Sequence, residues 1–338
     1  MSTRPLVIAH RGFPGERLEH TRPSYLLAIE HGCDYIEPDV VSTSDGVLVV
    51  RHENEIGGTT DVADHPEFAD RRTVKVIDGK ELTGWFTEDF TLEEIKTLRV
   101  RERLPELRPQ NLPLAGTEQI LTFDEVLTIA EEASAGRPDP VGVYVETKHP
   151  TYFAGLGYDL NTLLLDELRR HGADHEDAKI VIQSMETGNL RRLRAETSLT
   201  LIQLMEDKGA PYDLVASRDP RTYRDLEAPD ELRVIAEYAD GIGPNKNQVI
   251  GRDRKKRLAG RTPLVDDAHA VDLLVHIWTM RDENHFLPAD LRSAAGPSGR
   301  GDALAEYLAF FDAGVDGVFS DFTSTAIAAR EQWLARQP

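Results

Sequence analysis

The sequence predicts a closed barrel of eight parallel strands wrapped by helices, a (β/α)8 or TIM barrel. Its 338 residues suit one large barrel or two ordinary domains. Short apolar runs alternate with helical stretches, a pattern shared by doubly wound open sheets and barrels. Eight such runs favour the barrel: Leu6–Ala9, Tyr35–Val41, Val141–Val145, Lys179–Ile182, Leu199–Leu204, Gly241–Ile242, Leu273–Ile277 and Val315–Phe319.

The segments between these runs carry apolar residues at three- and four-residue spacings, which is typical of amphipathic helices. Helices of this kind cover the outside of a barrel with their apolar faces turned to the strands. The clearest are Ser24–His31, Phe123–Ala133, Leu160–His171, Asn189–Glu196, Ala303–Ala313 and Thr325–Ala335.

Two segments interrupt the alternation. Val47–Val50 resembles a strand but follows the second strand too closely for a parallel crossover, so it should return as a hairpin. A two-residue turn centred between Asp45 and Gly46 would place His52 opposite Asp39. Residues 55–118 show no strong strand pattern, and we expect them to form an inserted segment that caps one end of a single catalytic domain, 1–338.

The composition excludes several functions. With 39 Lys and Arg against 59 Asp and Glu, the net charge is −20, which disfavours a nucleic-acid partner. An anionic substrate would therefore need a local cluster of cations. Neither a spanning apolar segment nor a hydrophobic leader is evident, so we expect no stable membrane insertion. A cytoplasmic location is predicted for the chain as given, or a periplasmic or secreted one if a leader was removed. The sequence does not indicate the oligomeric state.

Glu37 and Asp39 lie two residues apart in the second predicted strand, so their side chains point to the same face. Two neighbouring carboxylates repel each other unless a positive group lies between them. Mg²⁺ and Ca²⁺ prefer carboxylate oxygens as ligands. The spacing therefore predicts a divalent-cation site.

Other polar residues fall at the ends of neighbouring strands. His10 ends the first strand, His52 follows the hairpin, and Glu146 and Lys148 lie two apart near the end of the third strand. Each alone has a structural explanation, because histidines at strand ends and paired acids on strands are common. Barrel enzymes, however, build their active sites at the carboxyl ends of the strands. Convergence of these residues on that end favours a functional site.

Motifs along nearly the whole chain resemble those of the glycerophosphodiester phosphodiesterases, in their longer bacterial, periplasmic-type branch. The first motifs are His10-Arg11-Gly12, Glu19-His20-Thr21, Ile36-Glu37, Asp39-Val40, Asp45-Gly46 and Val49-Val50-Arg51-His52. The later ones are Tyr144-Val145-Glu146-Thr147-Lys148, Ile182-Gln183 and the segments 239–244, 275–279 and 314–322.

The resemblance implies a TIM barrel of the phosphatidylinositol-phospholipase-like phosphodiesterase type. It implies metal-dependent hydrolysis of small glycerophosphodiesters to sn-glycerol 3-phosphate and an alcohol, with one divalent cation, Ca²⁺ or Mg²⁺. Residues matching the family's metal ligands are Glu37, Asp39 and Glu146, and those matching its acid–base pair are His10 and His52. Residues expected to contact the substrate or its phosphate are Arg11, Lys148, Gln183 and Trp278, although Trp278 also fits a core position.

The sequence departs from the family pattern at two positions. Glu53 follows His52 where Asp is usual, and Leu18 precedes Glu19 where Pro is usual. If the usual Asp assists the metal, Glu53 would alter the choice or affinity of the metal.

Two alternatives remain open. A related lysophospholipase D-like phosphodiesterase would need an apolar lip, whereas segment 55–118 is polar, with Asp61, Asp64 and Asp70. A non-catalytic barrel that binds a phosphate ligand would typically have lost a histidine or a metal carboxylate. Both histidines and all three carboxylates are present in this sequence.

Overall fold

The computed structural model describes residues 4–337, which form a closed barrel of eight parallel strands. The strands pair in the order β2-β1-β14-β13-β10-β9-β8-β7, and β7 pairs with β2 to close the ring. The predicted TIM barrel is confirmed; residues 1–3, on which the leader prediction partly rests, lie outside the described residues. The strands are β1 (Leu6–His10), β2 (Tyr35–Glu37), β7 (Gly142–Thr147), β8 (Ile180–Ser184), β9 (Thr200–Met205), β10 (Gly241–Pro244), β13 (Leu274–Met280) and β14 (Gly317–Ser320).

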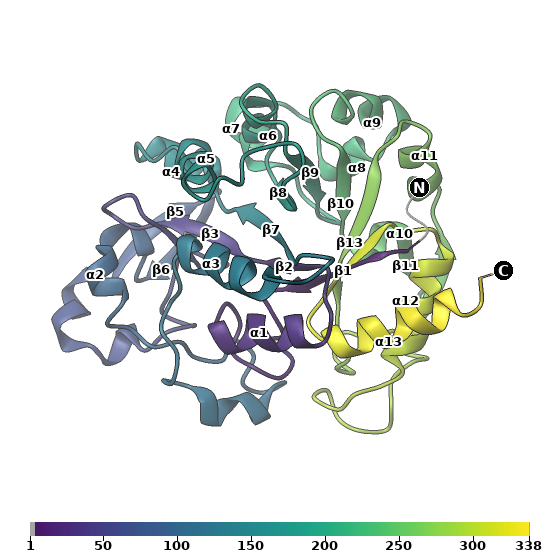
Figure 1. The fold of residues 1–338 in the computed structure, drawn as a ribbon, viewed down its shortest axis with the longest axis horizontal. Helices are drawn as coiled ribbons and strands as arrows, with labels where there is room; N and C mark the ends of the chain where they lie inside the picture. The colour runs from purple at the N-terminus through teal and green to yellow at the C-terminus, as the bar shows by residue number, and fades with distance from the viewer. Residues whose placement is uncertain (1–3, 338) are drawn as a thin grey trace.

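Helices surround the strands (Figure 1). Local signals start several of them: in α3 the Thr122 hydroxyl accepts the Glu125 N–H, while the Glu125 carboxylate accepts the Thr122 N–H. The helices around the ring are α1 (Arg22–Glu30), α3 (Phe123–Ser134), α4 (Pro150–Gly155), α5 (Leu160–Arg170), α6 (Thr187–Arg194), α7 (Tyr212–Ser217), α8 (Tyr223–Leu226), α9 (Pro229–Ile235), α10 (Lys246–Val249), α11 (Leu264–His269), α12 (Ala303–Asp312) and α13 (Thr323–Leu334).

Side chains fill the inside of the barrel, so the ring is not a pore. The interior cluster consists of Ile8, Tyr144, Val181, Ile202 and Phe319, and a larger apolar layer lies between the strands and the helices. Because adjacent side chains of a strand point to opposite faces, the same strands supply both layers. The packed interior leaves the carboxyl ends of the strands as the place for a cavity.

The predicted register of the hairpin is wrong by one residue. β3 (Asp39–Ser42) pairs with β4 (Leu48–Val50) so that Val40 faces Val50, and the Arg51 N–H donates to the Asp39 carbonyl at 3.1 Å. The loop holds three residues between Thr43 and Val47, with Gly46 at a φ of 78°, instead of a two-residue turn. A left-handed third residue is typical of three-residue hairpin loops. His52 therefore lies just beyond the strand.

Segment 55–118 is more regular than its sequence indicates and forms the blue part beside β3 in Figure 1. It contains the hairpin β5 (Thr73–Ile77) and β6 (Lys80–Gly84) and the short helix α2 (Leu92–Ile95). The hairpin has only four valine, isoleucine or leucine residues, and two of them, Val74 and Val76, are exposed, so its strands do not stand out from the polar sequence around them. A second unpredicted hairpin pairs β11 (Ile250–Arg252) with β12 (Leu258–Arg261).

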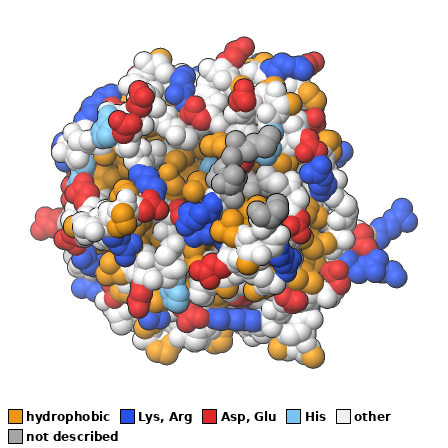
Figure 2. Space-filling view, turned by 45° about the vertical axis from the view of Figure 1, so that its right-hand side comes forward, with side chains coloured by type: hydrophobic (Ala, Val, Ile, Leu, Met, Phe, Trp, Pro, Cys, Tyr) orange, Lys and Arg blue, Asp and Glu red, His pale blue; other side chains and the backbone are white. Residues whose placement is uncertain are grey.

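Acidic and basic side chains are interspersed over the face shown in Figure 2. Within residues 4–337, none of the helices has the length and apolar character needed to cross a membrane.

Candidate active site

The carboxyl ends of the strands surround a cavity of about 680 Å³. The structure brings together the residues predicted to form the site. Eight of them line this cavity: His10, Arg11, Glu37, His52, Glu146, Lys148, Gln183 and Trp278. The ninth, Asp39, is 1% exposed and groups with two of them.

Glu37, Asp39 and Glu146 each offer a carboxylate oxygen, and these three oxygens lie within 4.8 Å of one another. Pro38 interrupts the second strand, which resumes as β3, and Asp39 then pairs with Glu146 of β7. Asp39 Oδ1 is buried and has no hydrogen-bond partner. An unpartnered carboxylate oxygen among other buried carboxylates fits a divalent cation, which prefers such ligands. These three residues could therefore hold the predicted metal.

Positive groups border this carboxylate cluster. The Arg11 backbone N–H donates to Glu37 Oε2 at 2.9 Å, and the Arg11 guanidinium lies 3.2 Å from Asp39 Oδ2. The Lys148 ammonium donates to Glu146 Oε1 at 2.8 Å. A φ of 58° at Arg11 turns the chain after β1 so that both its backbone and its side chain face the acids.

Burial and mutual repulsion shift the pKa values of the cluster apart. Burial, followed by the charge of Asp39, raises the pKa of Glu37 well above its usual value. Burial raises the pKa of Glu146 to about 7. Burial also opposes ionisation of Asp39, yet the charges of Lys148 and Arg11, with a hydrogen bond from His20, hold the pKa of Asp39 well below its usual value. The cluster thus keeps one firmly ionised carboxylate.

Each predicted catalytic histidine contacts its own carboxylate. His10 Nδ1 lies 2.6 Å from Asp321 Oδ1, directly after β14, and His52 Nδ1 lies 2.5 Å from Glu53 Oε1. His52 Nε2 lies 3.3 Å from the Lys148 ammonium. A carboxylate at Nδ1 fixes the tautomer with the proton on Nδ1 and leaves Nε2 able to accept a proton.

Glu53 is not one of the three grouped carboxylates. It accepts two hydrogen bonds from Arg103, at 3.0 and 2.7 Å, in addition to its contact with His52. Arg103 comes from segment 55–118 and also lines the cavity with Leu104. Glu53 therefore orients a histidine, and the longer side chain reaches Arg103.

Burial keeps both histidines neutral in the unliganded protein. It lowers the pKa of His10 to about 4, with a further contribution from Arg11. It lowers the pKa of His52 to about 3, with further contributions from Arg11 and Lys148.

Sequence reasoning assigned no role to two residues that support the site. His20 is fully buried and lies 2.9 Å from Asp39 Oδ2, with its other ring nitrogen 2.8 Å from the Tyr25 hydroxyl. Asp321 contacts Arg108 and Arg281 as well as His10. Both lie in motifs quoted for the family resemblance, but their partners are distant in sequence.

Gln183 and Trp278 occupy different settings in the cavity wall. The Gln183 amide donates to Glu37 Oε1 at 3.1 Å, while its carbonyl oxygen has no partner. Trp278 is half-buried, and its indole N–H donates to the Gly243 carbonyl at 2.7 Å. Gln183 therefore touches a predicted metal ligand, and Trp278 presents its ring to the cavity.

The cavity reverses the charge balance of the whole chain. Three carboxylates line it, those of Glu37, Glu146 and Glu206, against six cationic side chains: Arg11, Arg103, Lys148, Lys246, Arg252 and Arg281. This is the local cluster that an anionic substrate requires in a protein with a net charge of −20.

Comparison with known proteins assigns the chain to a family. The model of the glycerophosphoryl diester phosphodiesterase family matches residues 10–325. The chain belongs to this family. The expectation of an enzyme of the glycerophosphodiester phosphodiesterase type is thus confirmed at the family level.

Relatives and solved structures agree with this assignment. A glycerophosphodiester phosphodiesterase of Arabidopsis thaliana is 36% identical over 96% of this chain and 85% of its own. One of Haemophilus influenzae is 28% identical over 97% of this chain and 90% of its own. A putative glycerophosphoryl diester phosphodiesterase of Silicibacter pomeroyi shares the fold with a TM-score of 0.68 at 20% identity, covering 98% and 95% of the two chains. A phosphodiesterase of Oleispira antarctica in complex with sn-glycerol-3-phosphate has a TM-score of 0.60 at 19% identity, covering 97% of both.

Proposed function

We propose that this enzyme hydrolyses glycerophosphodiesters to sn-glycerol 3-phosphate and an alcohol, with His10 and His52 as the acid–base pair. One divalent cation, Ca²⁺ or Mg²⁺, would be held by Glu37, Asp39 and Glu146. The single observation that carries the proposal is a group of three buried carboxylates in which Asp39 Oδ1 accepts no hydrogen bond, beside a cavity lined by two carboxylate-bound imidazoles.

A phosphodiester is an anion, so its phosphorus is shielded from an attacking oxygen until positive groups withdraw charge. A bound divalent cation supplies Lewis-acid stabilisation of the phosphoryl oxygens. Arg11 and Lys148 contribute positive charge at the same place, because each contacts the carboxylate cluster from the cavity side.

The two imidazoles handle the protons. One Nε2 accepts the proton of the attacking oxygen, and the other imidazole delivers a proton to the leaving alkoxide. Asp321 and Glu53 stabilise the imidazolium at His10 and His52 respectively, since each accepts from Nδ1. An anionic phosphate in the cavity raises the pKa of a neighbouring histidine and so favours the protonated form that the acid requires.

The cationic lining suits a water-soluble diester, and the relative with bound sn-glycerol-3-phosphate supports that product class. Hydrolysis of glycerophosphocholine tests the proposal. We expect activity to vanish after treatment with a chelator and to return when Ca²⁺ or Mg²⁺ is restored. Full activity in the chelated enzyme, verified as metal-free by elemental analysis, would contradict metal dependence. Absence of glycerol 3-phosphate among the products would contradict the substrate assignment.

A further inference from the structure

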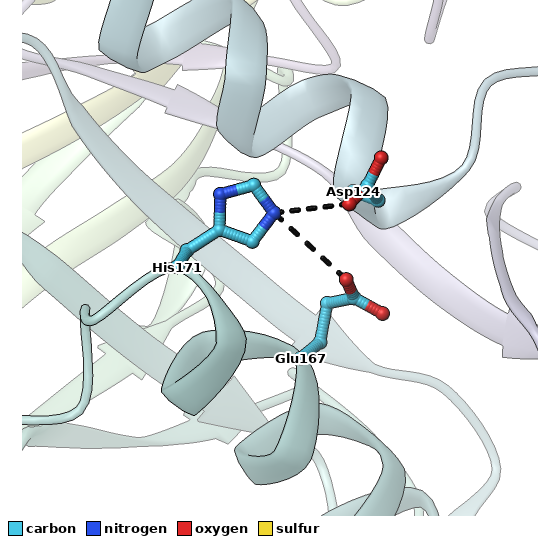
Figure 3. Close-up of side chains that lie close together, drawn as sticks. All are labelled: Asp124, Glu167 and His171. Carbon is cyan, nitrogen blue, oxygen red and sulfur yellow. Dashed lines mark hydrogen bonds and ion pairs between the residues drawn. The ribbon is translucent and has the colours of Figure 1, made fainter.

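A second group of metal-ligating side chains lies outside the barrel, between α3 and α5 (Figure 3). Asp124 lies in the first turn of α3, whereas Glu167 and His171 lie one turn apart at the end of α5. His171 Nε2 is 3.1 Å from Asp124 Oδ1 and 3.9 Å from Glu167 Oε1. The reaction proposed above uses none of these residues.

Glu167 carries a buried oxygen that accepts no hydrogen bond. Its side chain is only 7% exposed, and Oε2 is paired with Arg170. Oε1 is buried without a hydrogen-bond partner and faces His171 Nε2 and Asp124. A buried carboxylate oxygen without a donor is costly, so this oxygen points to a missing cation in the cluster.

Glu131 prepares the histidine for such a cation. Its carboxylate lies 2.7 Å from His171 Nδ1. Glu131 follows Asp124 by two helical turns, so both acids lie on the same face of α3, one at each ring nitrogen. Metal-binding histidines commonly donate their other ring N–H to a carboxylate, which leaves the ligating nitrogen with its lone pair.

We propose that Asp124, Glu167 and His171 bind a Zn²⁺ ion that joins α3 to α5. Donor atoms about 2.0–2.1 Å from a tetrahedral zinc lie roughly 3.3 Å apart, and the two distances from His171 Nε2 fall on either side of that value. Imidazole nitrogen combined with carboxylate oxygen suits zinc better than Mg²⁺ or Ca²⁺, which favour oxygen alone. The Asp124 side chain is 57% exposed, so solvent can complete the coordination.

Zinc analysis after equilibrium dialysis of the full chain tests the site. We expect Glu167→Gln and His171→Ala each to bind one zinc equivalent fewer than the parent. Glu131→Gln should weaken zinc binding by about 10- to 100-fold, because the ligating histidine loses its orienting carboxylate. Asp166→Asn is the matched control, since this neighbouring acid is 63% exposed and lies outside the cluster. Equal zinc content in all four variants would overturn the proposal.

A measurement on the unmodified protein avoids any dependence on folding of the variants. Zinc should protect His171 from acylation by diethyl pyrocarbonate, followed by mass spectrometry, while the exposed His175 keeps its reactivity. Labelling of His171 at the same rate with and without zinc would mean that the cluster is an ion-pair network only. Loss of the catalytic metal would not produce this protection pattern, so the two sites are tested separately.

Discussion

The two walls of the active-site cavity balance their buried charges in opposite ways. The wall formed by β1, β2, β3 and β7 gathers three carboxylates and leaves Asp39 Oδ1 without a hydrogen-bond partner. In the wall formed after β10 and β13, Lys246 and Arg252 both contact the fully buried Glu306, at 3.0 and 2.7 Å. Arg281 contacts Asp321 at 2.7 Å.

This difference distinguishes a wall that can bind a cation from a wall that holds its own cationic side chains in place. A buried ion pair that is complete within the protein keeps its geometry, and loss of one partner leaves a costly isolated charge. A buried excess of one sign is stable only with an external partner or with bound protons. The first wall is therefore suited to bind a cation. The second wall holds its positive charges in fixed positions facing the substrate.

The largest expected effect falls on the histidines of the cavity. His10→Ala and His52→Ala should each lower kcat by about two to four orders of magnitude, because each removes a positioned acid or base. Steady-state hydrolysis of glycerophosphocholine measures this, with His175→Ala, an exposed histidine, as control. Near-normal turnover in His52→Ala would remove this residue from the reaction.

Glu306→Gln should remove the negative charge that neutralises the cationic side chains of the second wall. It leaves the buried Lys246 and the partly buried Arg252 beside a neutral group, and we expect the free energy of unfolding to fall by about 3–5 kcal/mol. Glu37→Gln should cost much less, because burial already disfavours the charge of Glu37 by raising its pKa. Urea unfolding at neutral pH compares the two, with the exposed Glu331→Gln as control. Equal losses at Glu306 and Glu37 would contradict the comparison.

Asp282 follows β13 and is buried, and its response to pH extends the comparison. Burial raises its pKa from 3.8 to about 7, although Thr325 donates to it at 2.6 Å. The contribution of this carboxyl to stability is complete below pH 3.8 and is lost as the pH rises toward 7, because the unfolded chain ionises first. Asp282→Asn should remove this loss, about 4 kcal/mol across the window.

Urea unfolding of the parent protein and of Asp282→Asn at several pH values between 4 and 8 checks this expectation. The stabilities should diverge in favour of Asp282→Asn as the pH rises. Parallel pH profiles would show that Asp282 keeps its ordinary acidity in the folded protein.

The smallest expected effect concerns substrate selection. Trp278→Ala should raise KM severalfold and change the preference among glycerophosphodiester headgroups, because its ring faces the cavity. Kinetics with several diesters measures this, and unchanged KM values would assign Trp278 to packing. Leu104→Ala probes segment 55–118 in the same assay. Shortening that segment should instead cost stability, since its Phe90 and Ile95 are fully buried in the apolar layer of the barrel.

Several parts of the site could be predicted from the sequence because they depend on local periodicity. Alternation of apolar runs and amphipathic stretches indicates the barrel, and a two-residue spacing places Glu37 and Asp39 together. Strand ends identify His10 and Glu146 as neighbours once the barrel is assumed.

Only the tertiary structure decided the partners of these residues. Asp321 reaches His10 across 311 positions of sequence, when β14 closes beside β1. The hairpin register depended on whether its loop holds two or three residues, which the Asp45-Gly46 pair does not settle. The cluster of Asp124, Glu167 and His171 exists because two helices pack side by side. Periodicity is a property of consecutive residues and can be recognised in the sequence. These contacts instead depend on how distant elements align once the ring is closed.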